Sequence, residues 1–138
     1  TESRERPSQR EPSGQTRRVS SAKLPMSLPS NQEVTLSAFT YKVLEANLDR
    51  LAPSKLRLQF RIRLTNNDGY PTNFWNRTFR LLEDGVPRSP ISDLNESVEG
   101  HSAKEGLVEF AVPESVQHVL LQVRQGDDVA ELQFILPQ

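Results

Sequence analysis

The feature that most constrains this fold is an unbroken alternation of apolar and polar residues over positions 55–66, KLRLQFRIRLTN. The apolar residues are Leu56, Leu58, Phe60, Ile62 and Leu64. Successive side chains of a β-strand point to opposite faces, so the pattern predicts one strand that is apolar on one side and cationic on the other. Such a strand must lie on a second apolar layer, and the later segments are able to supply one.

The first 23 residues differ in composition from the rest of the chain. They contain one large aliphatic residue, Val19, among Arg, Glu, Ser, Gln, Pro and Gly. Such a segment buries too little apolar surface to offset its ordering entropy, so we expect residues 1–23 to be a disordered linker or tether. Residues 24–138 are then expected to form one domain.

The net charge of −1 is unevenly distributed. Residues 1–23 carry six basic and three acidic side chains (+3), and the remainder carries 11 basic and 15 acidic side chains (−4). A basic tail can bind a membrane surface or nucleic acid, but these charges are mixed and no run exceeds two, which favours a solvated linker. We therefore expect no nucleic-acid partner.

The compartment is not fixed by cysteine, because the chain has none; this excludes disulfides and thiol chemistry only. No apolar run approaches the roughly 18 residues of a membrane span. The chain begins with Thr1 rather than Met, which suggests removal of a signal or anchor. We expect membrane contact only through a tether or anchor outside this chain.

The segments beside the alternating strand contain three further signals. The apolar parity changes between Leu36 and Tyr41, which predicts a β-bulge near Ala38–Phe39. In the connection 45–54, we expect Leu48 and Leu51 to form one helical turn that is ended by Pro53. The sequence NNDGYP at 66–71 predicts a turn with Gly69 at positive φ; it lacks the closing Glu of a calcium loop.

The second half of the chain predicts more strands. A strand over 74–82 has Phe79 and Leu81 inward, Asp84-Gly85 forms a tight hairpin turn, and 86–91 is an edge strand because it contains two prolines. Residues 92–105 are expected to be an irregular loop, followed by strands at 106–113, 118–124 and 129–136. Their expected inward residues are Val108, Phe110, Val112, Val119, Leu121, Val123, Leu132, Phe134 and Leu136. The chain thus predicts an all-β, antiparallel β-sandwich of about seven strands.

Patterns of catalysis and metal binding are absent. The only histidines are His101 and His118, and a transition-metal site needs several converging His or Cys donors. There is no Gly-x-Ser-x-Gly elbow and no glycine-rich phosphate loop. We expect a protein that is not an enzyme and has no metal or cofactor.

Two groups of residues are candidates for partner or ligand contact. The first is the aromatic cluster of Tyr70, Phe74 and Trp75, in which the two adjacent aromatics must point to opposite sides of a strand. A buried Trp75, with Phe74 covering the end of the core, is favoured over a binding site. The second group is the row of Arg57, Arg61 and Arg63, for which pairing with acidic residues such as Glu109 or Glu131 is favoured over an acidic partner. The triplets at Asn76 and Asn95 match glycosylation sites, which matter only in a eukaryotic secretory pathway.

Three segments carry a resemblance to a known family: LTNN at 64–67, FRLLEDG at 79–85 and GLVEFAVP at 106–113. Over roughly residues 34–136 the chain resembles the immunoglobulin-like domains of uncharacterised bacterial secreted proteins and lipoproteins related to the immunoprotective antigens. The proline-rich return strand and the long loop at 92–105 depart from that pattern. The resemblance implies an immunoglobulin-like sandwich outside the cytoplasm (periplasmic, cell-surface or secreted), and it carries over no catalytic residue.

Two functions are consistent with these observations. The first is a non-catalytic binding or structural module of a bacterial envelope or secreted protein, whose partner is another protein or a cell-envelope component. The second is a carbohydrate-binding accessory domain of a larger enzyme, with Tyr70, Phe74 and Trp75 as the stacking platform.

Overall fold

The computed structural model describes residues 24–25 and 32–136, which form eleven strands and one short 3-10 helix. The predicted linker at 1–23 lies outside the described residues. The elements are β1 (Leu24–Pro25), β2 (Glu33–Leu36), β3 (Phe39–Ala52), β4 (Lys55–Asn66), β5 (Thr72–Trp75), η2 (Asn76–Thr78), β6 (Phe79–Glu83), β7 (Val86–Arg88), β8 (Asn95–Val98), β9 (Ser102–Pro113), β10 (His118–Gln125) and β11 (Asp128–Ile135).

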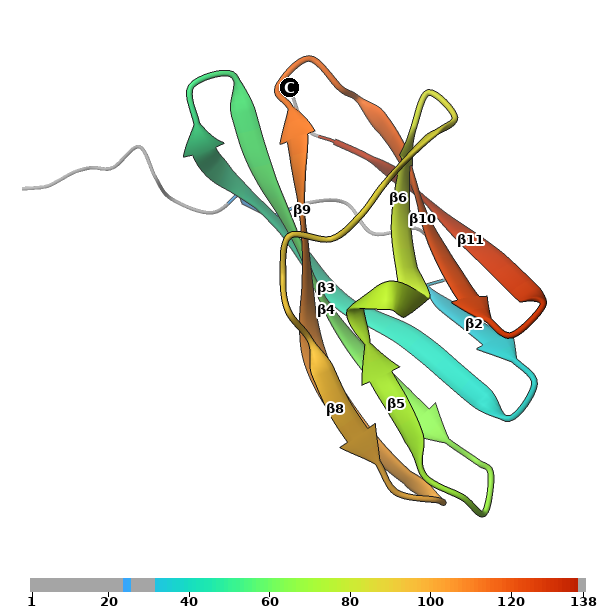
Figure 1. The fold of residues 1–138 in the computed structure, drawn as a ribbon. Helices are drawn as coiled ribbons and strands as arrows, with labels where there is room; N and C mark the ends of the chain where they lie inside the picture. Colours follow the sequence, from blue (N-terminus) through green and yellow to red (C-terminus); the bar gives the residue numbers. More distant parts are fainter. Residues whose placement is uncertain (1–23, 26–31, 137–138) are drawn as a thin grey trace, which may run out of the picture.

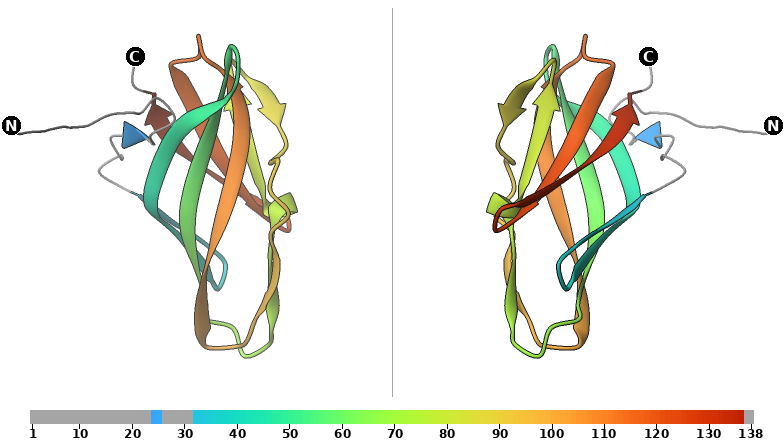
Figure 2. Two further views of the ribbon diagram at one scale, coloured as in Figure 1. Left: turned by 90° about the vertical axis from the view of Figure 1, so that its left-hand side faces the viewer. Right: turned by 90° about the vertical axis from the view of Figure 1, so that its right-hand side faces the viewer.

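The strands form two facing layers (Figures 1 and 2). The first layer is a sheet in the order β1-β3-β4-β9, in which β2 also pairs with β3. The second layer contains a sheet in the order β11-β10-β6-β7 and the separate pair β5–β8, which η2 connects to β6. Every pairing is antiparallel. The predicted all-β sandwich is confirmed.

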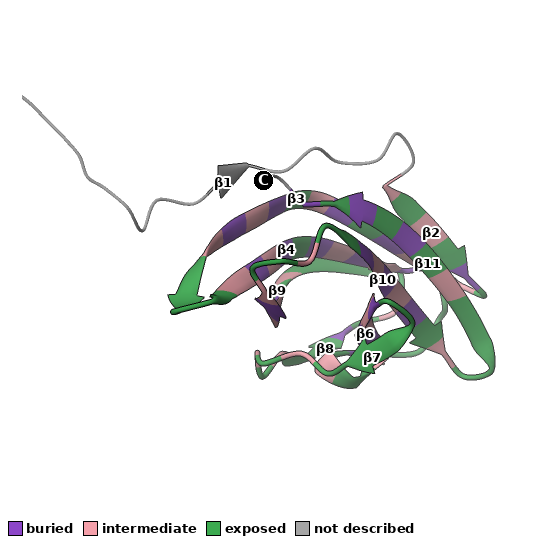
Figure 3. Ribbon diagram, turned by 90° about the horizontal axis from the view of Figure 1, so that it is seen from above, coloured by how far each residue is buried: buried purple, intermediate pink, exposed green. Residues whose placement is uncertain are grey.

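The alternation of β4 organises the core as predicted. The strand spans Lys55–Asn66, and its inward side chains Leu58, Phe60, Ile62 and Leu64 are completely buried. The ring of Phe60 lies 4.9 Å from that of Phe134 in the second layer, centre to centre. Seen from above, the first layer arches over β6, β7 and β8, and buried residues alternate along β3 and β4 (Figure 3). The predicted inward residues of β9 and β10, and those at 132–136, are all buried.

The predicted bulge near Ala38–Phe39 is wrong, because the parity change marks a hairpin. Ser37 and Ala38 form a turn between β2 and β3, with Ser37 at φ 57° and Leu36 paired with Phe39. A bulge does occur in β3, but it lies between Val43 and Glu45. It moves the buried positions from odd to even numbers, so that each side of the bulge keeps its own apolar parity.

The predicted helical turn at 45–54 is also wrong. Residues 45–52 continue β3, with Ala46 and Leu48 buried and Leu51 exposed.

The expected irregular loop at 92–105 is also wrong in part, because it contains β8 and the start of β9. Two predicted strands are each divided, at Ser37–Ala38 and at η2, and β1 and β8 are additional; these four changes account for the difference between seven strands and eleven.

The turn chemistry is confirmed at one position and wrong at another. Asp84 and Gly85 both have positive φ, 52° and 82°, and join β6 to β7. The strand β7 is the last in its sheet, as its proline content predicts. Gly69, in contrast, is not among the glycines with positive φ. The 67–71 loop is shaped by side-chain hydrogen bonds instead.

Candidate functional site

Asn66, the last residue of β4, fixes the loop that carries Tyr70. It is completely buried, and its Nδ2 donates to the carbonyl oxygens of Tyr70 (2.8 Å), Val98 (3.2 Å) and Glu99 (3.3 Å). Its Oδ1 accepts from the backbone N–H of Asp68 at 2.9 Å. One amide therefore contacts four backbone groups of two loops, and its two N–H groups are shared among three carbonyl oxygens. Sequence reasoning missed this residue, although its place in the inward parity of β4 was a usable signal.

A close backbone contact holds the same two loops together. A Cβ added at Gly100 would lie 2.6 Å from the carbonyl carbon of Gly69, which is a steric clash. Only glycine, which has no Cβ, fits this position without a shift of the backbone. The backbone N–H of His101 donates to the carbonyl oxygen of Asp68 at 3.1 Å. Tyr70, with 76% of its surface exposed, is thus presented on a loop that the adjacent loop braces.

The two adjacent aromatics of β5 point to opposite sides, as predicted. However, Phe74 faces the core and Trp75 faces outward, whereas the favoured interpretation placed Trp75 in the core. Phe74 is completely buried, 6.2 Å from the ring of Phe79, so it is not available to a partner. Trp75 is 36% exposed, so the interpretation of this residue as the buried tryptophan of the sandwich is wrong. The guanidinium carbon of Arg77 lies 5.0 Å from the centre of its ring, within cation–π range.

Polar side chains surround Trp75 on the outer side of the β5–β8 pair. In the register of this pair Trp75 is opposite Asn95, and Asn73 is opposite Ser97. Paired residues of an antiparallel ladder share one face, and Phe74 occupies the other, so these four residues lie on the outer face. An indole flanked by two amides and a hydroxyl offers both an apolar surface and hydrogen-bonding groups.

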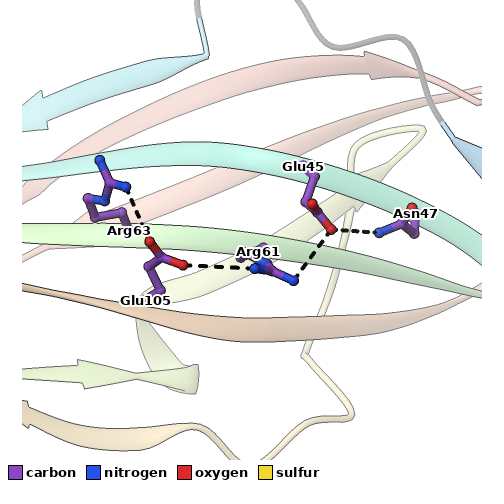
Figure 4. Close-up of polar contacts among 5 residues, drawn as sticks. All are labelled: Glu45, Asn47, Arg61, Arg63 and Glu105. Atoms are coloured by element: carbon purple, nitrogen blue, oxygen red, sulfur yellow. Dashed lines mark hydrogen bonds and ion pairs between the residues drawn. The ribbon is translucent and has the colours of Figure 1, made fainter.

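The arginine row lies on the outer side of the first layer and is ion-paired within the chain; Figure 4 shows the pairs of Arg61 and Arg63. Arg57 lies 3.7 Å from Asp49, and Arg61 lies between Glu45 (3.7 Å) and Glu105 (4.0 Å). Arg63 binds Glu105 at 3.2 Å.

The favoured interpretation of this row, pairing with neighbouring strands, therefore holds, but the named partners were wrong. Glu109 accepts a hydrogen bond from Gln59 at 2.5 Å, and Glu131 lies on β11 in the other layer. The pairs of Arg61 and Arg63 are largely exposed and contribute little stability each, whereas Asp49 in the Arg57 pair is mostly buried. Because the row and Trp75 lie on the outer sides of different layers, they do not form one site.

Tyr41 is the titratable group that burial perturbs most clearly. Its ring meets that of Phe79 edge-on at 5.7 Å, and its hydroxyl donates to Oε1 of Gln125 at 3.1 Å. Burial raises the pKa of Tyr41 from 10.0 to about 12, and a hydrogen bond with Thr78 partly opposes this. The neutral tyrosine ties β3 to β6 and β10, which is a structural role.

The remaining observations concern metal binding, the two glycosylation triplets and membrane spans. Within residues 24–25 and 32–136, no three or more His, Cys, Asp or Glu side chains gather into a group that could hold a metal ion. Asn76 is engaged with Ser92, whose hydroxyl donates to Asn76 Oδ1 at 2.8 Å, whereas Asn95 is exposed. The described part of the chain also contains no helix long and apolar enough to cross a membrane.

Comparisons with known proteins show a shared fold. No family model and no curated protein sequence matches this chain. Among solved structures it is similar to a candidate lipoprotein from Bacillus subtilis (14% identity, TM-score 0.62), and the match covers 78% of this chain and 39% of that protein. It is also similar to a functionally unknown protein from Listeria monocytogenes (12% identity, TM-score 0.58, 84% and 87% covered). A third is a conserved hypothetical protein from Bacillus anthracis (7% identity, TM-score 0.57, 80% and 96% covered).

Proposed function

We propose that this chain is a non-catalytic binding or structural module of a bacterial envelope or secreted protein, with an immunoglobulin-like sandwich as its scaffold. The carrying observation is that Trp75 is exposed on a paired strand while its neighbour Phe74 is anchored in the core. A large aromatic held this way offers contact area at little entropic cost, which is why such residues dominate binding energies. The partner is another protein or an envelope component.

Support for a place outside the cytoplasm comes from the structural neighbours. The fold is shared with a candidate lipoprotein, of which this chain spans 39%. A lipoprotein is tethered at the membrane surface, and residues 1–23 have the polar composition expected of a tether. The proposed module therefore works in the periplasm, on the cell surface or in the medium.

The test is binding of the purified chain to isolated bacterial envelope material, with two matched variants. Trp75→Ala should weaken binding about tenfold or more, the effect of losing one good aromatic anchor. Arg61→Ala, on the outer side of the other layer, should bind like the parent. If both variants bind as the parent does while remaining folded, Trp75 is not the contact residue and the proposal fails.

A second function is favoured by the residues beside Trp75. The amides of Asn73 and Asn95 and the hydroxyl of Ser97 share its face. A sugar ring can stack its apolar C–H face on an indole while its hydroxyls bond to neighbouring amides. This is the arrangement expected of a carbohydrate-binding accessory domain. Displacement of bound envelope material by free oligosaccharides would support this second function, and failure of displacement would support a protein partner.

A further inference from the structure

The outer sides of the two layers differ in character. On β4 the outward residues Arg57, Gln59, Arg61 and Arg63 are all polar. This is the usual state of a solvated face of an antiparallel sheet. On the second layer, Leu82 of β6 and Leu120 of β10 are outward, adjacent in register and only partly buried. The second layer therefore has an apolar strip where the first has a charged network.

The apolar positions continue onto β7 and, two residues away from the same row, onto β11. Leu82 pairs with Pro87 on the edge strand β7, and Leu120 pairs with Gln133 on β11. Ile135, two residues further along β11, is 58% exposed. We call Pro87, Leu82, Leu120 and Ile135 the Leu82–Leu120 face. An open hollow of about 420 Å³ lies beside it, lined by Leu82, Leu120, His118 and Gln133 among others.

The next row of the same face carries two charges of opposite sign. Arg80, Gln122 and Glu131 are in register across β6, β10 and β11. Arg80 donates to the carbonyl oxygens of Phe79 (2.7 Å) and Arg77 (3.4 Å), and Glu131 accepts from Gln122 at 3.4 Å. Among the residues that the structure describes, neither charge has an ion-pair partner.

The positions of Arg80 and Glu131 make this row of the face complementary to itself. A two-fold axis that runs parallel to β10, midway between two facing sheets, places β6 of one copy over β11 of the other. Arg80 of each copy then faces Glu131 of the other copy, and Leu120 lies over Leu120. A two-fold interface repeats every contact, so the two charge pairs form together. Sheets packed face to face lie about 10 Å apart, within reach of these side chains.

We propose that two copies of this chain associate through the Leu82–Leu120 face about this axis. Association removes the apolar strip from water and gives Arg80 and Glu131 the partners that they lack within one copy. The exposed side of β5–β8, with Trp75, belongs to the same layer as this sheet. This proposal does not depend on what Trp75 binds.

The first experiment is sedimentation equilibrium of the full chain at concentrations up to about 1 mM. The parent should show a monomer–dimer equilibrium. Leu120→Asp, which buries an unpaired charge in the interface, should weaken association at least about tenfold. The matched control is Leu107→Asp, since Leu107 is 44% exposed on the outer side of the first layer and should leave association unchanged.

The second experiment uses a charge exchange that is independent of the apolar substitution. Arg80→Glu and Glu131→Arg should each weaken self-association, because each places like charges opposite one another. An equimolar mixture of the two variants should restore the dimer, because the heterodimer regains both opposite-charge pairs. Thermal unfolding checks that each variant is folded. Association that is retained by all three variants, or a mixture no stronger than its components, would overturn the proposed interface.

Two other results would also overturn it. A parent chain that is monomeric throughout the concentration range has no such dimer. Association that survives Leu120→Asp but is lost on removal of residues 1–23 would show that the N-terminal segment, and not a second copy of this face, makes the contact.

Discussion

Replacing Asn66 tests how the loop bearing Tyr70 is held. The side chain makes one fully buried polar contact, to Val98, and three partly buried ones, to Tyr70, Glu99 and Asp68. An unsatisfied buried group costs about 1–3 kcal/mol, and each hydrogen bond in a partly solvated place contributes about 0.5–1.5 kcal/mol. Because the two N–H groups of Nδ2 are shared among three carbonyl oxygens, the side chain contributes three hydrogen bonds in all, and Asn66→Ala should lower the free energy of unfolding by about 2–6 kcal/mol.

An isosteric substitution separates the hydrogen bonds from the volume. Asn66→Asp keeps the oxygen that accepts from the backbone N–H of Asp68, but it places a carboxylate opposite three carbonyl oxygens. At neutral pH it should therefore lower the free energy of unfolding at least as much as Asn66→Ala does. Burial raises the pKa of such a carboxyl, and its protonated form donates again. The loss of stability should therefore shrink as the pH falls.

The assay is urea denaturation followed by circular dichroism, with the slope of the transition compared among variants. Asn67→Ala is the matched control, because Asn67 is exposed next to Asn66 and should change stability by no more than about 0.5 kcal/mol. If Asn66→Ala also falls within that range, the amide does not support the loop and the reasoning is refuted.

Three further predictions concern the core and the loops. Phe60→Ala should cost about 3–5 kcal/mol in the same denaturation assay, whereas Arg61→Ala should cost about 0.5 kcal/mol or less; equal effects would contradict the alternation of β4. Burial raises the pKa of Tyr41 from 10.0 to about 12, so the neutral side chain stabilises the folded state fully below pH 10. This stabilisation, about 2–3 kcal/mol in the free energy of unfolding, is lost as the pH rises toward 12. Comparing the parent with Tyr41→Phe by denaturation over this range should show the loss in the parent alone. Gly100→Ala should cost about 1–3 kcal/mol, because its Cβ meets the backbone of Gly69; a neutral effect on the melting temperature would show that the two loops separate easily.

Much of the fold was predictable because strand periodicity is a local property. The bounds of β4, the inward residues of β9 and β10, and the Asp84–Gly85 turn all follow from patterns within a few residues. The bulge after Val43 shows where this fails. It changes the parity in mid-strand, so Ala46 and Leu48 do not continue the earlier alternation although both are buried. A pattern broken this way looks like a connection.

The candidate site was less predictable because it depends on which side of a short strand faces the core. In the four residues of β5, alternation separates Phe74 from Trp75 but does not determine which one is inward. That choice is made by the packing of Phe74 against Phe79 and beside Gly106, whose missing side chain leaves room for it. The partners of the arginine row likewise depend on cross-strand register, which pairs Arg61 with Glu45.

The orientation of Trp75 is the central claim, and one measurement tests it directly. Trp75 is the only tryptophan of the chain, so its fluorescence reports on this position alone. The folded protein should show red-shifted emission that acrylamide quenches readily, and saturating envelope material or oligosaccharide should protect the indole from the quencher. Blue-shifted emission that resists quenching in the folded protein would place Trp75 in the core and contradict both the orientation of β5 and the binding surface built on it.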